Sequence, residues 1–333
     1  MKTFAFLIQP SGLEEAKEYW PILRFLPDPL GKFILKQKKS FKTVFARRIL
    51  SSKKSQISGF FLVSPLIPEN VNDTTPETVL ENIISAGRMA EKLGADIIGL
   101  NGYLSLVADK KRMIYRHIRI PITTGNAFLA WSVFEAVYRL VRERKIDPLN
   151  APLAIIGASS CAGSLCALKF SEYFTKIIVN GQDKNKLNKL AENISLFGKC
   201  QPVIESDVHK AVESAKIVIL FDELNGIVPF IKDFAPGSII CDATLSKSIY
   251  SRLNERKDLE IIKGGLVKLP CKTNLGLANG FKKGLAYASV AEVMLLLFTE
   301  KLVNYSLGES INVDKMEEIA DFAAQYGFET FVS

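Results

Sequence analysis

The stretch that decides the fold is Leu153-Ala-Ile-Ile-Gly-Ala-Ser-Ser-Cys-Ala-Gly163. Its first four residues are apolar and predict a buried strand that ends at Gly157. The residues after Gly157 are all small, and Gly163 is expected to open a helix. Such a turn lets backbone N–H groups face an anion at a helix N-terminus, so the stretch predicts a pyrophosphate-binding site. Tight packing without a ligand is the alternative for this pattern.

The glycine spacing departs from G-x-G-x-x-G, because Ser159 stands where the middle glycine would. The next expected strand, Ile177–Val179, is followed by Asn180-Gly-Gln-Asp183. A site for NAD normally carries an acidic residue at this strand end, where it binds the ribose hydroxyls. Here the strand end is neutral and lysines follow, which favours NADPH. Asp183 leaves NADH as the alternative cofactor.

Strands and helices alternate regularly after 147–150. Further strands are expected at Ile217–Phe221, Ile239–Asp242 and Ile261–Ile262. The alternation predicts an α/β protein with a doubly wound parallel sheet, forming a Rossmann-like dinucleotide-binding domain over 148–283. Residues 1–147 and 284–333 are expected to form a smaller, discontinuous α/β domain that binds substrate and carries the catalytic residues.

Ligands of doubly wound sheets lie beyond the carboxyl ends of the strands. Asp242 and Thr244 close one expected strand, and a glycine pair follows the next. That pair would let the backbone approach a nicotinamide ring, although a tight turn without a ligand explains it equally well. The residues expected to bind the cofactor are therefore Gly157, Ala158, Ser159, Ser160, Cys161, Ala162, Gly163, Asn180, Gly181, Gln182, Asp242, Thr244, Gly264 and Gly265.

A polar cluster, Thr123-Thr124-Gly125-Asn126, precedes an expected amphipathic helix. Hydroxyl and amide donors at this place could hold the carbonyl oxygen of a substrate, so Thr124 and Asn126 are candidate catalytic residues. Helix capping is the alternative, and it needs only one of them.

The composition of the chain is that of a globular protein without a membrane-spanning segment. Among 333 residues, 48% are hydrophobic and 23% are charged, which is ordinary for a globular chain. Five cysteines without a C-x-x-C pair indicate a reducing, cytoplasmic location, and with only two histidines no metal site is expected. No apolar stretch is long enough to span a bilayer, and the apolar start is expected to be a strand rather than a signal peptide.

The net charge of +8 is unevenly spread. The segment Lys32–Lys54 holds many lysines and arginines and no acidic residue, which favours an anionic partner; a solvated face without a partner is the alternative. Because no nucleic-acid-binding motif accompanies the charge, nucleic acid is not expected to be that partner.

Several blocks in the same order resemble one family. They are Ile122–Asn126, Gly157–Gly163, Gly264–Val267, Ala288–Leu295, and Ile311–Glu317 with Tyr326–Phe328. The region from Ile97 onward resembles the long-chain acyl-(acyl-carrier-protein) reductases. These have shikimate-dehydrogenase-like architecture and relatives described as predicted amino acid dehydrogenases. The resemblance implies that an acyl group passes from acyl carrier protein or coenzyme A to an enzyme cysteine, and that NADPH then releases a fatty aldehyde. It also makes an acidic carrier protein the expected partner of Lys38, Lys39, Arg47 and Arg48.

The family's nucleophilic cysteine lies in an Ala-Cys-x-Ala-Glu block, and Ser289 occupies the matching position. A serine hydroxyl ionises far less readily than a thiol and needs a positioned base. Three explanations are open: direct hydride transfer, a deliberate Cys-to-Ser replacement, or an inactive relative. Cys271 is an alternative nucleophile. The chain also lacks the family's Gly-Ala-Thr-Gly turn, and Gln182 stands where an arginine for the 2′-phosphate is expected.

Three functions follow from these observations. The first is an NAD(P)-dependent acyl thioester reductase with Ser289, Thr124 and Asn126 at its catalytic site. The second is a dehydrogenase of a small hydroxy or amino acid that uses direct hydride transfer. The third is a non-catalytic protein that binds nucleotide or acyl carrier.

Overall fold

The computed structural model divides into two compact units. The first comprises Met1–Gly125, Lys268–Ser310 and Asp321–Glu329, and the second comprises the rest. The structure describes residues 1–38, 40–71, 74–100, 114, 116–196, 199–221, 228–244, 253, 255–276, 283–307 and 311–332. Lys39 therefore lies outside the described residues, as does the side chain of Arg47.

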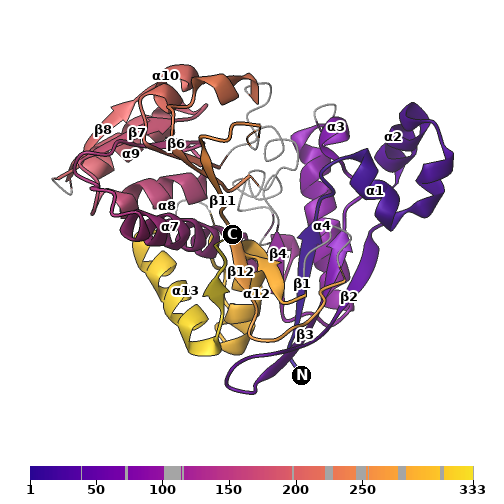
Figure 1. Cartoon of the computed structure of the whole chain (residues 1–333). Helices are drawn as coiled ribbons and strands as arrows, with labels where there is room; N and C mark the ends of the chain where they lie inside the picture. The colour runs from indigo at the N-terminus through magenta and orange to yellow at the C-terminus, as the bar shows by residue number, and fades with distance from the viewer. Residues whose placement is uncertain are drawn as a thin grey trace. The chain divides into compact units, whose positions relative to one another are not determined.

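The first unit contains a mixed sheet, whose described strands run in the order β2-β3-β1-β4-β5 (Figure 1). They are β1 (Thr3–Ile8), β2 (Lys42–Leu50), β3 (Gln56–Val63), β4 (Ile97–Leu100) and β5 (Ile122–Thr123). All neighbours are parallel except β2, which pairs antiparallel with β3 at one edge. Helices of this unit are α1 (Leu13–Tyr19), η1 (Pro21–Phe25), α2 (Asp28–Gln37), α3 (Pro68–Val71), α4 (Pro76–Lys92) and α12 (Ala288–Phe298).

The long helix α4 forms as its sequence predicts. Pro76 stands at its first position, and the hydroxyl of the N-cap residue Thr75 accepts a hydrogen bond from the Thr78 N–H. Its apolar residues share a core with the strands, and Val79 and Ile83 are fully buried there. The helix therefore covers one face of the first sheet.

The second unit contains a sheet whose described strands are parallel and run in the order β11-β10-β9-β6-β7-β8. They are β6 (Leu153–Ile156), β7 (Lys176–Asn180), β8 (Gln201–Ile204), β9 (Ile217–Leu220), β10 (Ile239–Asp242) and β11 (Glu260–Lys263). Counted from β6, this order is 3-2-1-4-5-6, the order of dinucleotide-binding folds. The predicted α/β class with a doubly wound parallel sheet is confirmed.

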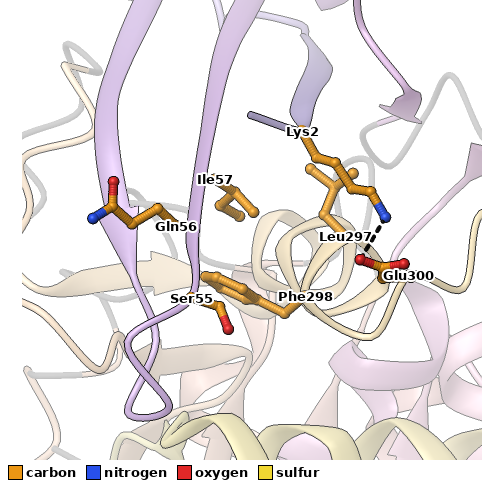
Figure 2. Close-up of a pocket in the computed structure, with 7 residues that line it drawn as sticks. All are labelled: Lys2, Ser55, Gln56, Ile57, Leu297, Phe298 and Glu300. Carbon is orange, nitrogen blue, oxygen red and sulfur yellow. Dashed lines mark ion pairs between the residues drawn. The ribbon is translucent and has the colours of Figure 1, made fainter.

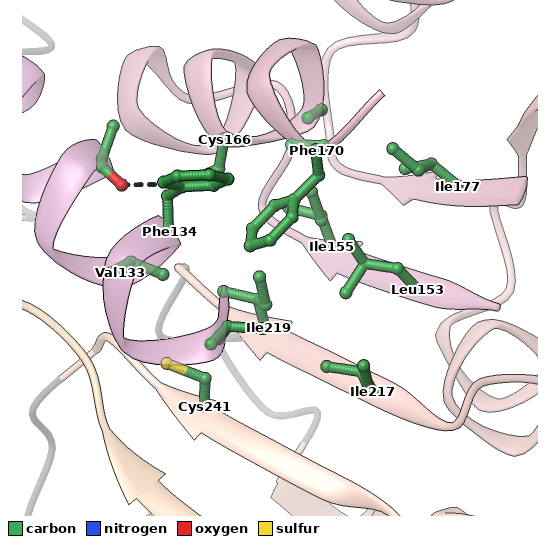
Figure 3. Packing of buried hydrophobic residues seen from close by; sticks show 14 of the residues in the cluster. Val133, Phe134, Leu153, Ile155, Cys166, Phe170, Ile177, Ile217, Ile219 and Cys241 are labelled. Atoms are coloured by element: carbon green, nitrogen blue, oxygen red, sulfur yellow. Dashed lines mark hydrogen bonds between the residues drawn. The ribbon is translucent and has the colours of Figure 1, made fainter. Parts of the chain in front are cut away.

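Alternate residues of β6 face opposite sides of this sheet, which explains why all four are apolar. Leu153 and Ile155 pack into one core with α7 (Asn126–Glu143), α8 (Cys161–Phe170) and α9 (Lys184–Leu196), as Figure 3 shows in part. Ala154 and Ile156 pack into a second core with α10 (Val208–Glu213). η2 (Val228–Asp233) follows β9.

Helix α7 places the boundary between the units earlier than expected. The predicted boundary was 147–150, but the second unit begins at Asn126. The reason is that the apolar stripe of α7, including Val133 and Phe134, lies in the core of the second sheet with Ile155 and Phe170 (Figure 3). Residues 268–276, expected in the second domain, belong to the first unit.

The remaining described elements complete the chain. They are β12 (Leu266–Lys268), β13 (Leu285–Tyr287), α13 (Val313–Tyr326) and β14 (Glu329–Thr330). The first part of α13 packs on the second unit, where Lys169 of α8 forms ion pairs with Glu172 and with Glu317 of α13. Burial alone would lower the pKa of Lys169, but the hydrogen bonds that its ammonium donates to Glu172 and Glu317 raise it.

Candidate functional site

The turn between β6 and α8 is held by the backbone. Gly157 has φ +85°, a backbone conformation that residues other than glycine rarely adopt. The N–H groups of Gly157 and Ala158 both donate to the Asn180 carbonyl. A Cβ on Gly163 would lie 2.4 Å from the Gly157 oxygen, so helix and strand approach as closely as glycine allows. Ser160 caps α8, accepting from the Gly163 N–H and donating to the Gly157 carbonyl. The turn lies at the carboxyl end of β6, where the strand order reverses between β6 and β9.

Ser159 and Gly181 fit one another across neighbouring strands. A Cβ on Gly181 would lie 2.5 Å from Ser159 Oγ and 3.0 Å from the Ser159 N. The serine at the middle-glycine position is therefore accommodated because a glycine, Gly181, directly follows β7. Among the hydrogen bonds of the described residues, none uses the Ser159 N–H, so this donor is available to an anion.

Three polar residues at the carboxyl end of β7 have different surroundings. Asn180 is buried, and its side chain donates to the Glu205 carbonyl, so it supports the sheet edge rather than a ribose. Gln182 is exposed. Asp183 accepts from the N–H groups of Asn185 and Lys186 and thereby caps α9. The choice between NADPH and NADH stays open.

The other residues expected to bind the cofactor lie at the carboxyl ends of β10 and β11. The Asp242 carboxylate is buried and accepts from both the N–H and the hydroxyl of Thr244. A Cβ on Gly264 would lie 2.8 Å from the Cys241 sulfur, so packing alone explains this glycine. Gly265 is buried and has φ +75°, which requires glycine.

In the first unit, the end of β5 joins the start of α12. A Cβ on Gly125 would lie 2.3 Å from Ser289 Cα and 2.4 Å from its Cβ, and Gly125 has φ +75°. Ser289, the second residue of α12, therefore lies against Gly125, and its role at a catalytic site with Thr124 and Asn126 stays a prediction. No hydrogen bond joins the Ser289 hydroxyl to another residue within the described part of the chain.

Glu292 is a residue of this site to which sequence reasoning gave no role. It lies one turn after Ser289 on α12, it is fully buried, and its carboxylate accepts a hydrogen bond from the equally buried Thr123 hydroxyl. The spacing of three residues puts Ser289 and Glu292 on one helix face, and that spacing was the available signal.

The structure describes the surroundings of Thr124 and Asn126, the two other candidate catalytic residues. Thr124 is buried, and its hydroxyl donates its one hydrogen to the Ser306 carbonyl, so this hydrogen is engaged within the protein. Asn126 begins α7 and is half-buried. A role for either residue in binding substrate stays a prediction.

The cysteines fall into two classes. Burial raises the pKa of Cys200 to about 11 and also raises the pKa values of Cys166 and Cys241, which suppresses the thiolate form of all three. Cys161, the first residue of α8, and Cys271 are half-buried. Among the described residues, no cluster of histidine, cysteine or acidic side chains could hold a metal ion.

Two surface features lie elsewhere. The basic segment Lys32–Lys54 does not form one patch, because Lys36 precedes β2 and Lys53 follows it, and this strand of nine residues is about 30 Å long. A hollow of about 150 Å³ lies between Lys2, Ile57 and Phe298, with Glu300 paired to Lys2 (Figure 2). It lies at the amino ends of β1 and β3, opposite to the end where such sheets bind ligands. No helix in the described residues is long and apolar enough to cross a bilayer.

The curated proteins similar in sequence include an aminotransferase and a reductase. Aminotransferase PigE of Serratia sp. (strain ATCC 39006) is 23% identical over 285 residues, which are 84% of this chain. The match spans only 33% of PigE, about a third of its length. A long-chain acyl-[acyl-carrier-protein] reductase of Synechococcus elongatus is 23% identical over 296 residues, 84% of this chain and 85% of that protein. No protein-family model matches the chain.

Among solved structures, L-tryptophan dehydrogenase from Nostoc punctiforme is similar with a TM-score of 0.45 and 16% identity, over 99% of this chain and 84% of that one. Shikimate 5-dehydrogenase from Listeria monocytogenes gives 0.40 and 10% identity over 96% of each chain.

Proposed function

We propose that the chain is an NAD(P)-dependent oxidoreductase of the acyl reductase type, acting on an acyl thioester. One observation carries the proposal: a glycine-opened turn of small residues lies at the switch point of a parallel sheet with the dinucleotide-binding strand order. The sequence similarity to an acyl-[acyl-carrier-protein] reductase over most of both chains supports the substrate class.

The cofactor's pyrophosphate would lie at Gly157–Gly163. Close approach is allowed there because Gly163 packs directly on the Gly157 oxygen and because the Ser159 side chain is turned toward Gly181. The Ser159 N–H and the first turn of α8 would donate to the phosphates. When bound, the nicotinamide supplies or accepts a hydride. Asp242 and Thr244 would lie beside the cofactor at the carboxyl end of β10. Gly265 would allow the backbone to approach the nicotinamide ring.

Ser289 would contact the acyl group. The backbone of Ser289 is in contact with Gly125. One helical turn later on α12, Glu292 accepts a hydrogen bond from Thr123 and so joins the helix to the end of β5. Because its hydroxyl has no hydrogen-bonded base within the described residues, we expect little acyl-enzyme from the protein as it stands. The turn would orient the thioester rather than ionise the serine.

The test is Ser289→Cys, with Ser195→Cys on the exposed end of α9 as the matched control. We expect incubation with a long-chain acyl coenzyme A to add one acyl group to the Ser289→Cys protein, detected by intact-protein mass spectrometry. NADPH should then release the aldehyde. Equal acylation of both variants would mean nonspecific transfer and would contradict the proposal.

The missing base at Ser289 also favours a second candidate, a dehydrogenase that transfers hydride directly to or from a small hydroxy or amino acid. NADPH binding without acylation of Ser289→Cys, together with turnover of such an acid, would establish it. NADPH binding without any turnover would indicate a non-catalytic binding protein.

A further inference from the structure

Helix α4 carries a polar stripe on the side that faces away from the first sheet. Its apolar residues, including Val79 and Ile83, are buried against the strands. Residues three or four apart lie on one face of a helix, and a second set with this spacing lies on the opposite side and is exposed. The exposed residues are Glu77, Glu81, Ser85, Arg88 and Lys92. We call these five residues the α4 stripe.

The α4 stripe is acidic in its first half and basic in its second half. Glu81, Arg88 and Lys92 form no ion pair with any described residue, and Arg88 Nη2 lies 3.4 Å from His117 Nδ1. An acidic first turn and a basic last turn complement the helix dipole, which accounts for Glu77 and Lys92. Because the dipole acts mainly on these two turns, it does not account for Glu81 and Arg88.

Two antiparallel copies of the α4 stripe are complementary in charge. The midpoint of the stripe lies between Ile84 and Ser85. Glu81 precedes this midpoint by as many residues as Arg88 follows it, and the two outer residues of the stripe are also equally spaced about it. A two-fold axis through the midpoint therefore places Glu81 opposite Arg88 of the partner subunit, and the symmetry repeats this contact. Opposite charges then meet along the whole stripe.

Further basic residues lie beside the basic half of the stripe. A Cβ on Gly87 would lie 2.3 Å from the Ile118 side chain, so the segment that contains Ile118 packs directly on α4. The exposed residues Arg116 and Arg119 belong to this segment. Glu91 accepts a hydrogen bond from the Arg119 N–H, and its single carboxylate does not balance the basic side chains around it. The basic half therefore has an excess of positive charge.

We infer that the α4 stripe is the contact of a weak, salt-sensitive dimer of this chain, in which two α4 helices pack antiparallel about a two-fold axis. The dimer is weak because exposed ion pairs each contribute little. A nucleic acid or an anionic membrane fits less well, because Glu81 would repel it. A different acidic protein would use the basic half and leave Glu81 without a counter-charge, whereas a second copy uses both halves. The inference does not depend on the proposed function.

The experiment is sedimentation equilibrium of the whole chain over a range of concentrations. We expect a monomer–dimer equilibrium at low salt that shifts toward the monomer as salt is added. Glu81→Arg alone and Arg88→Glu alone each place like charges opposite one another at both inner contacts. Each should raise the dissociation constant of the dimer by at least about tenfold. The matched controls are Glu192→Arg and Lys189→Glu on the exposed side of α9, which should dimerise as the unchanged protein does.

A mixing experiment tests the antiparallel register itself. An equal mixture of the Glu81→Arg chain and the Arg88→Glu chain should dimerise again, because opposite charges then meet at both inner contacts. Glu81→Arg/Arg88→Glu should dimerise by itself for the same reason. Ser85→Cys should form a disulfide-linked dimer on oxidation, since residue 85 lies next to the axis, whereas Ser195→Cys on α9 should not.

Three results would overturn the inference. The first is a monomer at every concentration at low salt. The second is a dimer that neither charge reversal weakens, which would place the contact elsewhere on the chain. The third is a mixture of the two reversed chains that stays monomeric.

Discussion

The carboxyl ends of the two sheets are built in different ways. At the end of β6, in the second unit, small residues and backbone groups form the turn, and the Ser159 N–H is available. At the end of β5, in the first unit, the buried Thr123 and Thr124 hydroxyls are engaged by Glu292 and Ser306. The first arrangement suits an anion recognised by amides, while the second holds a helix start in a fixed place. One strand end is therefore built from backbone groups and the other from buried side chains.

Gly157→Val would break the first arrangement with the largest effect. A β-branched residue at φ +85° is strained and adds bulk beside the phosphates, so we expect NADPH affinity to fall at least about 100-fold. Gly237→Val is the matched control, because Gly237 also has a positive φ and a Cβ there would meet only the Lys216 ammonium at 3.6 Å. Both should lose roughly 1–3 kcal/mol of stability. Unchanged affinity in folded Gly157→Val, measured by nicotinamide fluorescence, would remove the cofactor site from this turn.

Thr123→Val probes the second arrangement. Valine keeps the shape but removes the hydroxyl, leaving the buried Glu292 carboxylate without this donor, so we expect a loss of roughly 2 kcal/mol in the free energy of unfolding. Thr123→Ser should stay close to the unchanged protein. Thr123→Val/Glu292→Met removes both partners and should recover much of the loss, since neither polar group is then unsatisfied. Additive losses in denaturant unfolding would show that the two side chains are not coupled.

The second sheet was predictable because its strands are short apolar runs between turn signals. Leu153–Ile156 and Ile239–Asp242 have the predicted bounds, and the helix cap at Thr75 forms as expected. The boundary between the two units after Gly125 was not predictable. The amphipathic pattern of α7 indicates that one face of the helix is buried, but it does not indicate against which sheet.

The candidate site was predictable only in part. Glycines in a sequence indicate where the backbone can approach a ligand or another segment closely, and the contact of Gly125 with Ser289 is such a close approach. Hydrogen bonds between side chains distant in sequence leave no such mark. Thr123 and Glu292 are 169 residues apart, and the engagement of Thr124 by Ser306 depends on tertiary structure alone.

Thiol labelling tests whether NADPH binds at the end of β6 and not in the first unit, with a smaller expected effect than the substitutions above. Cys161 is the first residue of α8, directly after the β6–α8 turn, and Cys271 lies in the first unit. Both are half-buried, whereas burial raises the pKa of Cys200 to about 11. At pH 8 we expect iodoacetamide to modify Cys161 and Cys271 well before Cys200, Cys166 and Cys241. NADPH at ten times its Kd should slow modification of Cys161 about tenfold, because about a tenth of the sites are then empty. Cys271 should react at an unchanged rate. Peptide mapping separates the two thiols: protection of neither would remove the ligand from the turn, and equal protection of both would mean that NADPH tightens the whole chain instead of covering one strand end.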